Sequence, residues 1–162
     1  EYKGTREFIT LARGLNNYRF ELVINDSQEN IDRYLNDNRI VPTENLTIHP
    51  RQDDVTPFYN HASLVLNLTN RRYAIETFGL TALEAMTAGL PVIVPTVGGI
   101  AEMVTDGENG YKIDSQDCEK VKKCIENILR NKDVFVNLSR NALAKSKLYD
   151  AARMVDNIAV VL

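Results

Sequence analysis

Hydrophobic and polar residues follow two patterns along this chain, one typical of helices and one typical of strands. A helical stripe is predicted for residues 5–15, where the apolar side chains are Phe8, Ile9, Leu11, Ala12 and Leu15. Short apolar runs predict strands at residues 20–24, 46–48, 63–67, 92–94 and 111–113. The run at 92–94 is uniformly apolar, which favours a parallel strand that is covered on both faces.

Capping and turn residues indicate where the helices between these strands begin and end. Ser27 is expected to cap a helix that reaches about residue 36. The acidic pair at 53–54 is expected to open a helix that runs through Tyr59. A further helix is predicted for residues 79–88, because this stretch is dense in Ala, Leu and Met. Gly89 is expected to end it, and Pro91 follows as a stop signal.

The alternation of strands and helices predicts an α/β fold, a Rossmann-like parallel sheet with helices on both faces. Residues 115–162 form a predicted helical C-terminal tail, with breaks at Asp133 and Asp150. Ligands of such sheets bind beyond the carboxyl ends of the strands. Because the chain opens on a helix with no strand before it, we expect a domain that is truncated at its N-terminus.

Composition excludes several classes of protein. The 162 residues are 44% hydrophobic and 25% charged with a net charge of -3, which excludes general disorder and argues against nucleic-acid binding. No apolar run approaches the roughly 20 residues of a membrane span. Cys118 and Cys124 are six residues apart and fall on different helix faces, which favours free thiols and a reducing, cytoplasmic compartment. His49 and His61 have no acidic partner at motif spacing, so we interpret them as structural or surface residues and expect no metal site.

The segment most informative about chemistry contains two glutamates, Glu76 and Glu84. Glu84 falls in a helical stretch that is apolar nearly all round, which predicts burial and therefore a partner for the carboxylate, with a ligand hydroxyl as one candidate. The helix start at residues 78–81 offers free backbone N–H groups and the positive end of the helix dipole. This pattern predicts a phosphate site beside two hydrogen-bond acceptors.

The same segment resembles a known family. Residues 76–93, ETFGLTALEAMTAGLPVI, are similar to the E-x7-E region of the retaining GT-B glycosyltransferases called glycosyl transferases group 1, or family 4. The loops GGIAE at 98–102 and DGENG at 106–110 match the following loops of that family in order and spacing. Lys3-Gly4 resembles the Lys-Gly pair at the start of the first helix in its C-terminal domain.

The resemblance implies that residues 1–162 are one nucleotide-sugar-binding domain, the C-terminal half of a GT-B fold. It implies transfer of a sugar from a nucleotide-diphosphate donor to an acceptor hydroxyl, with retention and without a metal or other cofactor. The expected partners are the nucleotide sugar, an N-terminal GT-B domain of the same protein, and an acceptor sugar or lipid-linked sugar. The common setting of the family is polysaccharide synthesis, in a cytoplasmic protein that can be peripheral at the inner membrane face when full-length.

The resemblance also implies roles for individual residues. Glu76, the candidate catalytic carboxylate, would contact hydroxyls of the donor sugar. Glu84 would hold the ribose hydroxyls of the nucleotide, and Lys3 would neutralise the diphosphate. Backbone groups at two glycine-containing segments would approach the diphosphate or the sugar, namely those of Phe78, Gly79, Leu80, Thr81, Gly98 and Gly99.

Two other functions remain open at this point. The chain could be a non-catalytic nucleotide-sugar binding module, or another GT-B enzyme such as a nucleotide-sugar epimerase. It also departs from the family pattern, because Asn25-Asp26-Ser27 replaces a glycine-rich turn and the arginine expected ahead of Lys3 is missing. The loop at 49–53 would select the base, but its residues do not indicate which base that is.

Overall fold

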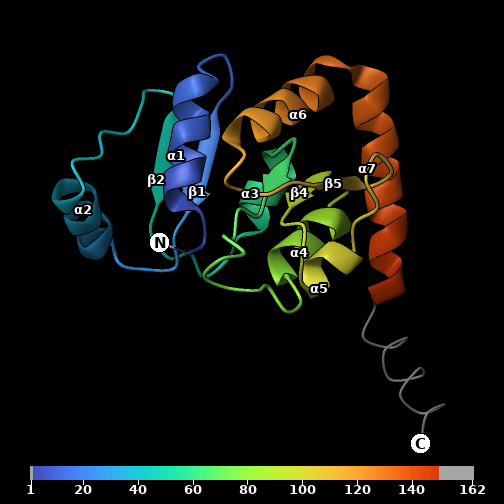
Figure 1. The fold of residues 1–162 in the computed structure, drawn as a ribbon, viewed down its shortest axis with the longest axis horizontal. Coiled ribbons are helices and arrows are strands. Elements are labelled where there is room, and N and C mark those ends of the chain that lie inside the picture. Colours follow the sequence, from blue (N-terminus) through green and yellow to red (C-terminus); the bar gives the residue numbers. More distant parts are fainter. Residues whose placement is uncertain (1, 150–162) are drawn as a thin grey trace, which may run out of the picture.

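The computed structural model describes residues 2–149, along which helices and strands alternate (Figure 1). The elements are α1 (Thr5–Gly14), β1 (Phe20–Val23), α2 (Gln28–Asp37), β2 (Leu46–His49), α3 (Thr56–His61), β3 (Val65–Leu66), α4 (Leu80–Thr87), β4 (Val92–Val94), α5 (Gly99–Glu102), β5 (Gly110–Lys112), α6 (Cys118–Arg130), α7 (Lys132–Ser146) and a final 3-10 turn (Lys147–Tyr149). The break expected near Asp133 lies at Asn131, between α6 and α7. The break expected at Asp150 lies outside the described residues.

Every strand pairing in the described part is parallel, which confirms the α/β class. The strands form two hydrogen-bonded ladders, β1–β2 and β3–β4–β5. β3 is two residues long. The Val65 amide donates to the carbonyl of Pro91, just before β4, and the Asn67 amide, just after β3, donates to the carbonyl of Ile93 in β4. In Figure 1 the first ladder lies with α1 and α2, the second lies with α4 and α5, and α6 spans from α1 to α7.

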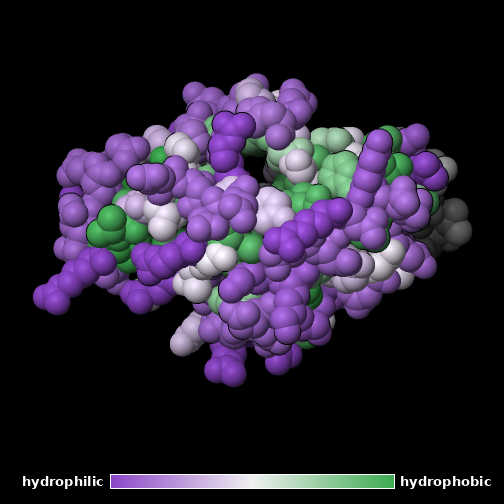
Figure 2. Space-filling model, turned by 90° about the horizontal axis from the view of Figure 1, so that it is seen from above, coloured by the Kyte–Doolittle hydropathy of each residue, from purple (hydrophilic) through white to green (hydrophobic). Residues whose placement is uncertain are grey.

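A shared hydrophobic core joins the two ladders. Phe20 of β1, Leu46 of β2 and Ile93 of β4 belong to one buried cluster. The inner stripe of α6 completes this cluster with Val121, Ile125 and Ile128, which recur at helical spacing. Burying each such aliphatic side chain contributes about 1.5–3 kcal/mol. The face seen in Figure 2 is mostly hydrophilic, with apolar residues in smaller patches.

Side-chain caps explain several of the helix starts. The hydroxyl of Ser27 accepts the amide of Asn30, so the predicted cap of α2 is confirmed. The expected start of α3 at residues 53–54 is wrong, because the helix begins at Thr56. The carboxylate of Asp54 instead accepts the Thr56 amide, so this acidic residue caps the turn before the helix. No helix among the described residues is long and apolar enough to cross a membrane.

Candidate functional site

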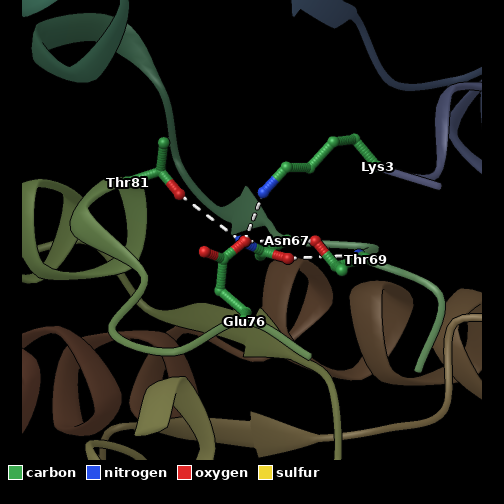
Figure 3. A network of polar contacts seen from close by, with 5 residues as sticks. All are labelled: Lys3, Asn67, Thr69, Glu76 and Thr81. Atoms are coloured by element: carbon green, nitrogen blue, oxygen red, sulfur yellow. Dashed lines mark hydrogen bonds and ion pairs between the residues drawn. The ribbon is translucent and has the colours of Figure 1, made fainter. Parts of the chain in front are cut away.

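Lys3 and Glu76 form an ion pair at the carboxyl end of the second ladder (Figure 3). The Lys3 Nζ atom lies 2.5 Å from Oε2 of Glu76. The Glu76 side chain is 18% exposed and that of Lys3 is 56% exposed, so water still reaches the ammonium. The hydrogen bond from Lys3 holds the pKa of the Glu76 carboxyl below its ordinary value, although partial burial opposes the shift.

The backbone around Lys3 is held in place. Gly4, the residue before α1, has a φ of 84°, in the left-handed region that favours glycine. A Cβ atom at this position would overlap the backbone and side chain of Leu68. The amide of Asn70 also donates to the carbonyl of Tyr2 at 2.8 Å. Lys3 is therefore anchored beside the segment that follows β3.

Two further polar residues, which the sequence reasoning missed, support Glu76. The hydroxyl of Thr69 donates to Oε2 of Glu76 at 3.3 Å. The side-chain carbonyl of Asn67 accepts the Thr69 amide at 3.1 Å, and its amide group lies 3.5 Å from the Thr81 hydroxyl (Figure 3). Their position directly after β3 is a signal that could have found them, because ligand sites of parallel sheets lie at these strand ends.

The start of α4 has no side-chain cap, and the first residues of the helix are exposed. Gly79 precedes the helix with a φ of 79°. Leu80 is 63% exposed and Thr81 is also exposed. The ring of Phe78 instead packs edge-on against Tyr149, with the ring centroids 6.5 Å apart. The first-turn amides thus form a positively polarised surface beside Glu76.

The Gly98-Gly99 loop lies against the backbone of the Glu76 segment. A Cβ atom at Gly98 would overlap the Glu76 carbonyl, and one at Gly99 would overlap the Thr77 carbonyl. Both overlaps are closer than real Cβ atoms tolerate. These glycines therefore allow two loops to touch and so hold Glu76 in place.

The exposure of Glu84 differs from the sequence prediction. The helix α4 is not buried all round, and the expectation that Glu84 is a buried carboxylate is wrong, because its side chain lies on the exposed face. The helix packs on the core through one side only, which consists of Ala82, Ala85 and Met86. The carboxylate does have a partner that sequence reasoning missed, since the Tyr59 hydroxyl donates to its Oε2 at 2.9 Å.

His49 is half-buried and His61 is exposed, which agrees with their interpretation as structural or surface residues, and both lie near the carboxylate of Glu21. Their Nε2 atoms lie 4.0 Å and 3.5 Å from Oε2 of Glu21. The parallel register of β1 and β2 pairs Val23 with His49 and so brings Glu21 to the same face, a relation that chain spacing does not reveal. Within residues 2–149 no three His, Cys, Asp or Glu side chains gather in a way that could hold a metal ion.

A surface hollow lies at the carboxyl ends of β1 and β2. Its volume is about 380 Å³, and its lining comprises Asn25, Asp26, Ser27, Asn30, Pro50 and Arg51. The Arg51 side chain donates to the Asn25 side chain at 2.6 Å, which ties the turn after β1 to the loop after β2. This hollow includes the 25–27 turn that departs from the family pattern and part of the 49–53 loop.

Comparison with known proteins places these features in a family. The sequence profile of the family described as Glycosyl transferases group 1 matches residues 1–145. The N-acetyl-alpha-D-glucosaminyl L-malate synthase of Bacillus anthracis is 31% identical over 103 residues, which cover 64% of this chain and 26% of that protein.

Solved structures show the same fold. The Anabaena protein HepE, in complex with UDP, aligns with a TM-score of 0.85 at 22% identity, over 99% of this chain and 45% of HepE. The C-terminal domain of a glycosyl transferase group 1 family protein (LpcC) from Francisella tularensis aligns with a TM-score of 0.73 at 20% identity, over 93% of this chain and 81% of that domain's chain. The chain thus spans about a quarter of the curated relative and less than half of HepE. With the profile match covering nearly its whole length, the chain belongs to the glycosyl transferases group 1 family and shares its GT-B type of fold.

Proposed function

We propose that residues 1–162 form the donor-binding domain of a retaining glycosyltransferase, which transfers a sugar from a nucleotide-diphosphate sugar to an acceptor hydroxyl. The observation that carries this proposal is the Lys3–Glu76 pair beside the uncapped start of α4. An ammonium and free helix amides suit a diphosphate, and a carboxylate suits sugar hydroxyls. These are the two parts of a nucleotide-sugar donor that meet at the reacting bond.

In the proposed reaction the bond between the anomeric carbon and the diphosphate breaks, and a bond to the acceptor oxygen forms. Negative charge develops on the departing phosphate oxygen. The Lys3 ammonium and the amides at the start of α4 would stabilise that charge, with no metal required. Glu76 would act at the donor sugar, where its carboxylate accepts hydrogen bonds from the hydroxyls and fixes the ring.

The nucleoside end of the donor would lie toward Glu84. Its carboxylate is exposed and accepts one hydrogen bond from Tyr59, so acceptor positions remain for ribose hydroxyls. Backbone groups of Phe78 to Thr81 and the Gly98-Gly99 loop would line the path between the two glutamates. The complexes of HepE with UDP and with UDP-glucose support this class of ligand.

We also propose that a second GT-B domain of the same protein supplies the acceptor site. The match to less than half of HepE, and to most of an isolated C-terminal domain, supports this division. The acceptor would be a sugar or lipid-linked sugar. A cytoplasmic setting, with the full-length protein peripheral at the inner membrane face, is consistent with the free thiols of Cys118 and Cys124.

Ligand-observed NMR with UDP, GDP, ADP and their sugars tests the donor site. We expect one nucleoside diphosphate to bind the wild-type chain and to lose affinity in Glu84→Ala. Glu44→Ala is the matched control, because Glu44 is exposed and precedes β2 at the opposite, amino edge of its ladder. Equal affinity in wild type and Glu84→Ala would contradict the assignment of Glu84.

Catalysis requires the full-length protein. We expect it to transfer sugar with retention, as read from the anomeric NMR signals of the product. The 162-residue chain alone is expected to transfer none, because half of the proposed cleft is absent from it. Nucleotide binding without any transfer by the full-length protein would favour the non-catalytic module instead.

A further inference from the structure

We infer that Tyr59 is a positioning residue that holds Glu84 ready for ribose and thereby makes the site select ribonucleotides over deoxyribonucleotides. This inference rests on the proposed function and goes one step beyond it. Tyr59 lies on α3, 25 residues before Glu84, and no motif of the sequence connects the two. Its hydroxyl donates to Oε2 of Glu84 at 2.9 Å and lies 3.5 Å from the Thr81 carbonyl.

The phenol itself is well placed to act as a fixed donor. Tyr59 is half-buried, and its ring packs against the buried cluster that contains Met86 and Val92. Burial and the adjacent Glu84 carboxylate both raise the pKa of Tyr59, so the hydroxyl keeps its proton at any physiological pH. The ring position is thus set by packing, and the hydrogen bond transfers that rigidity to an exposed side chain.

Glu84 depends on this contact. Among residues 2–149, Tyr59 is the one side chain that hydrogen-bonds the Glu84 carboxylate. A free glutamate on a helix surface samples many rotamers, and ordering such a side chain on binding weakens affinity by about three- to tenfold. With Oε2 held by Tyr59, Oε1 and the remaining lone pair of Oε2 can accept the adjacent 2′ and 3′ hydroxyls of a ribose.

The test compares ribose with deoxyribose nucleotides. The nucleoside diphosphate that binds best among UDP, GDP and ADP is titrated together with its 2′-deoxy and 3′-deoxy forms. We expect Tyr59→Phe to weaken the ribonucleotide about three- to tenfold and to weaken each deoxy form less, because each keeps only one of the two hydroxyls that the positioned carboxylate accepts. The selectivity for ribose would therefore fall, which loss of packing alone would not produce, because the phenyl ring remains.

Tyr34→Phe is the matched control. The Tyr34 hydroxyl is buried and has no hydrogen-bond partner, so the same substitution there removes no contact. We expect unchanged affinity for all the nucleotides. A second variant, Glu84→Asp, shortens the carboxylate and should separate it from Tyr59 even if Tyr59→Phe folds poorly. It should reduce ribose selectivity in the same way.

A double-mutant cycle makes the inference specific to this pair. Once Glu84→Ala is present, adding Tyr59→Phe should cause no further loss of ribonucleotide affinity. Losses that add would overturn the inference, as would an unchanged ribose selectivity in Tyr59→Phe. If the wild-type chain binds no nucleoside diphosphate, the proposed donor site itself fails. If Glu84→Ala weakens binding but Tyr59→Phe does not, only the role of Tyr59 fails.

Discussion

The ammonium of Lys3 and the carboxylate of Glu76 lie 2.5 Å apart although the two residues are 73 positions apart in the chain. The pair joins the residue proposed to neutralise the diphosphate with the residue proposed to hold the donor sugar. A diphosphate that attracts Lys3 would draw it from Glu76 and leave that carboxylate free for hydroxyls. The diphosphate and the sugar of the donor would thereby bind to the two members of one ion pair.

The first prediction concerns the pH dependence of stability. Lys3 holds the pKa of Glu76 below its ordinary value of 4.5, so the pair stabilises the fold above that pH and the increment is lost as the pH falls through the folded-state pKa. Lys3→Met should lower the free energy of unfolding by about 0.5–1 kcal/mol at neutral pH, since the pair is partly exposed. Urea unfolding at several pH values measures this difference.

Lys123→Met is the control for that experiment, because Lys123 is exposed and has no ion-pair partner among the described residues. The change that Lys123→Met causes in the free energy of unfolding should be small and independent of pH. A difference between Lys3→Met and wild type that persists after Glu76 is protonated would show that Lys3 stabilises the fold by another route.

The second prediction concerns the Gly98-Gly99 loop. The methyl group of Gly99→Ala would overlap the carbonyl oxygen of Thr77, so the loop or the Glu76 segment must move. We expect a loss of about 3 kcal/mol in the free energy of unfolding and weaker donor binding. Gly14→Ala at the end of α1 meets only the flexible Lys122 side chain and should stabilise by about 0.5 kcal/mol. Equal midpoints for the two variants in thermal unfolding would contradict the close-approach argument.

The third prediction concerns metal ions. Because Lys3 and the α4 amides are proposed to balance the diphosphate charge, nucleotide affinity should be unchanged by EDTA. Added Mg²⁺ should change it by less than about threefold, through weak binding to the free nucleotide. A tenfold gain in affinity with Mg²⁺ would show that the charge balance proposed here is incomplete. Titration calorimetry with and without each addition makes the measurement.

The fourth prediction uses the buried hydroxyl of Tyr34. This group has no hydrogen-bond partner, so it carries a desolvation cost without a compensating bond. Tyr34→Phe should therefore raise the free energy of unfolding by about 1 kcal/mol. Chemical denaturation measures the change. A destabilised variant would indicate that an ordered water satisfies the hydroxyl.

Much of the local structure was predictable because its causes are local. Ser27 caps α2 through a hydrogen bond to a residue three positions away, and Gly89 ends α4 through its own backbone conformation. Such interactions depend on side-chain types and short spacings that can be read along the chain. The positions of Glu76 and of the uncapped α4 start, both at one end of the second ladder, also followed from the order of strands and helices.

The sequence by itself therefore determined the α/β class, most element positions and the types of group in the candidate site. Only the tertiary structure decided which groups meet, as for Lys3 with Glu76, Tyr59 with Glu84, and Glu21 with the two histidines. It also decided that Glu84 is exposed, although the residues around it are apolar. The physical reason is that such contacts depend on strand register and on which side of a helix faces the core. The strand register and the buried side of each helix are set by packing across the whole chain, and the spacing of neighbouring residues does not determine them.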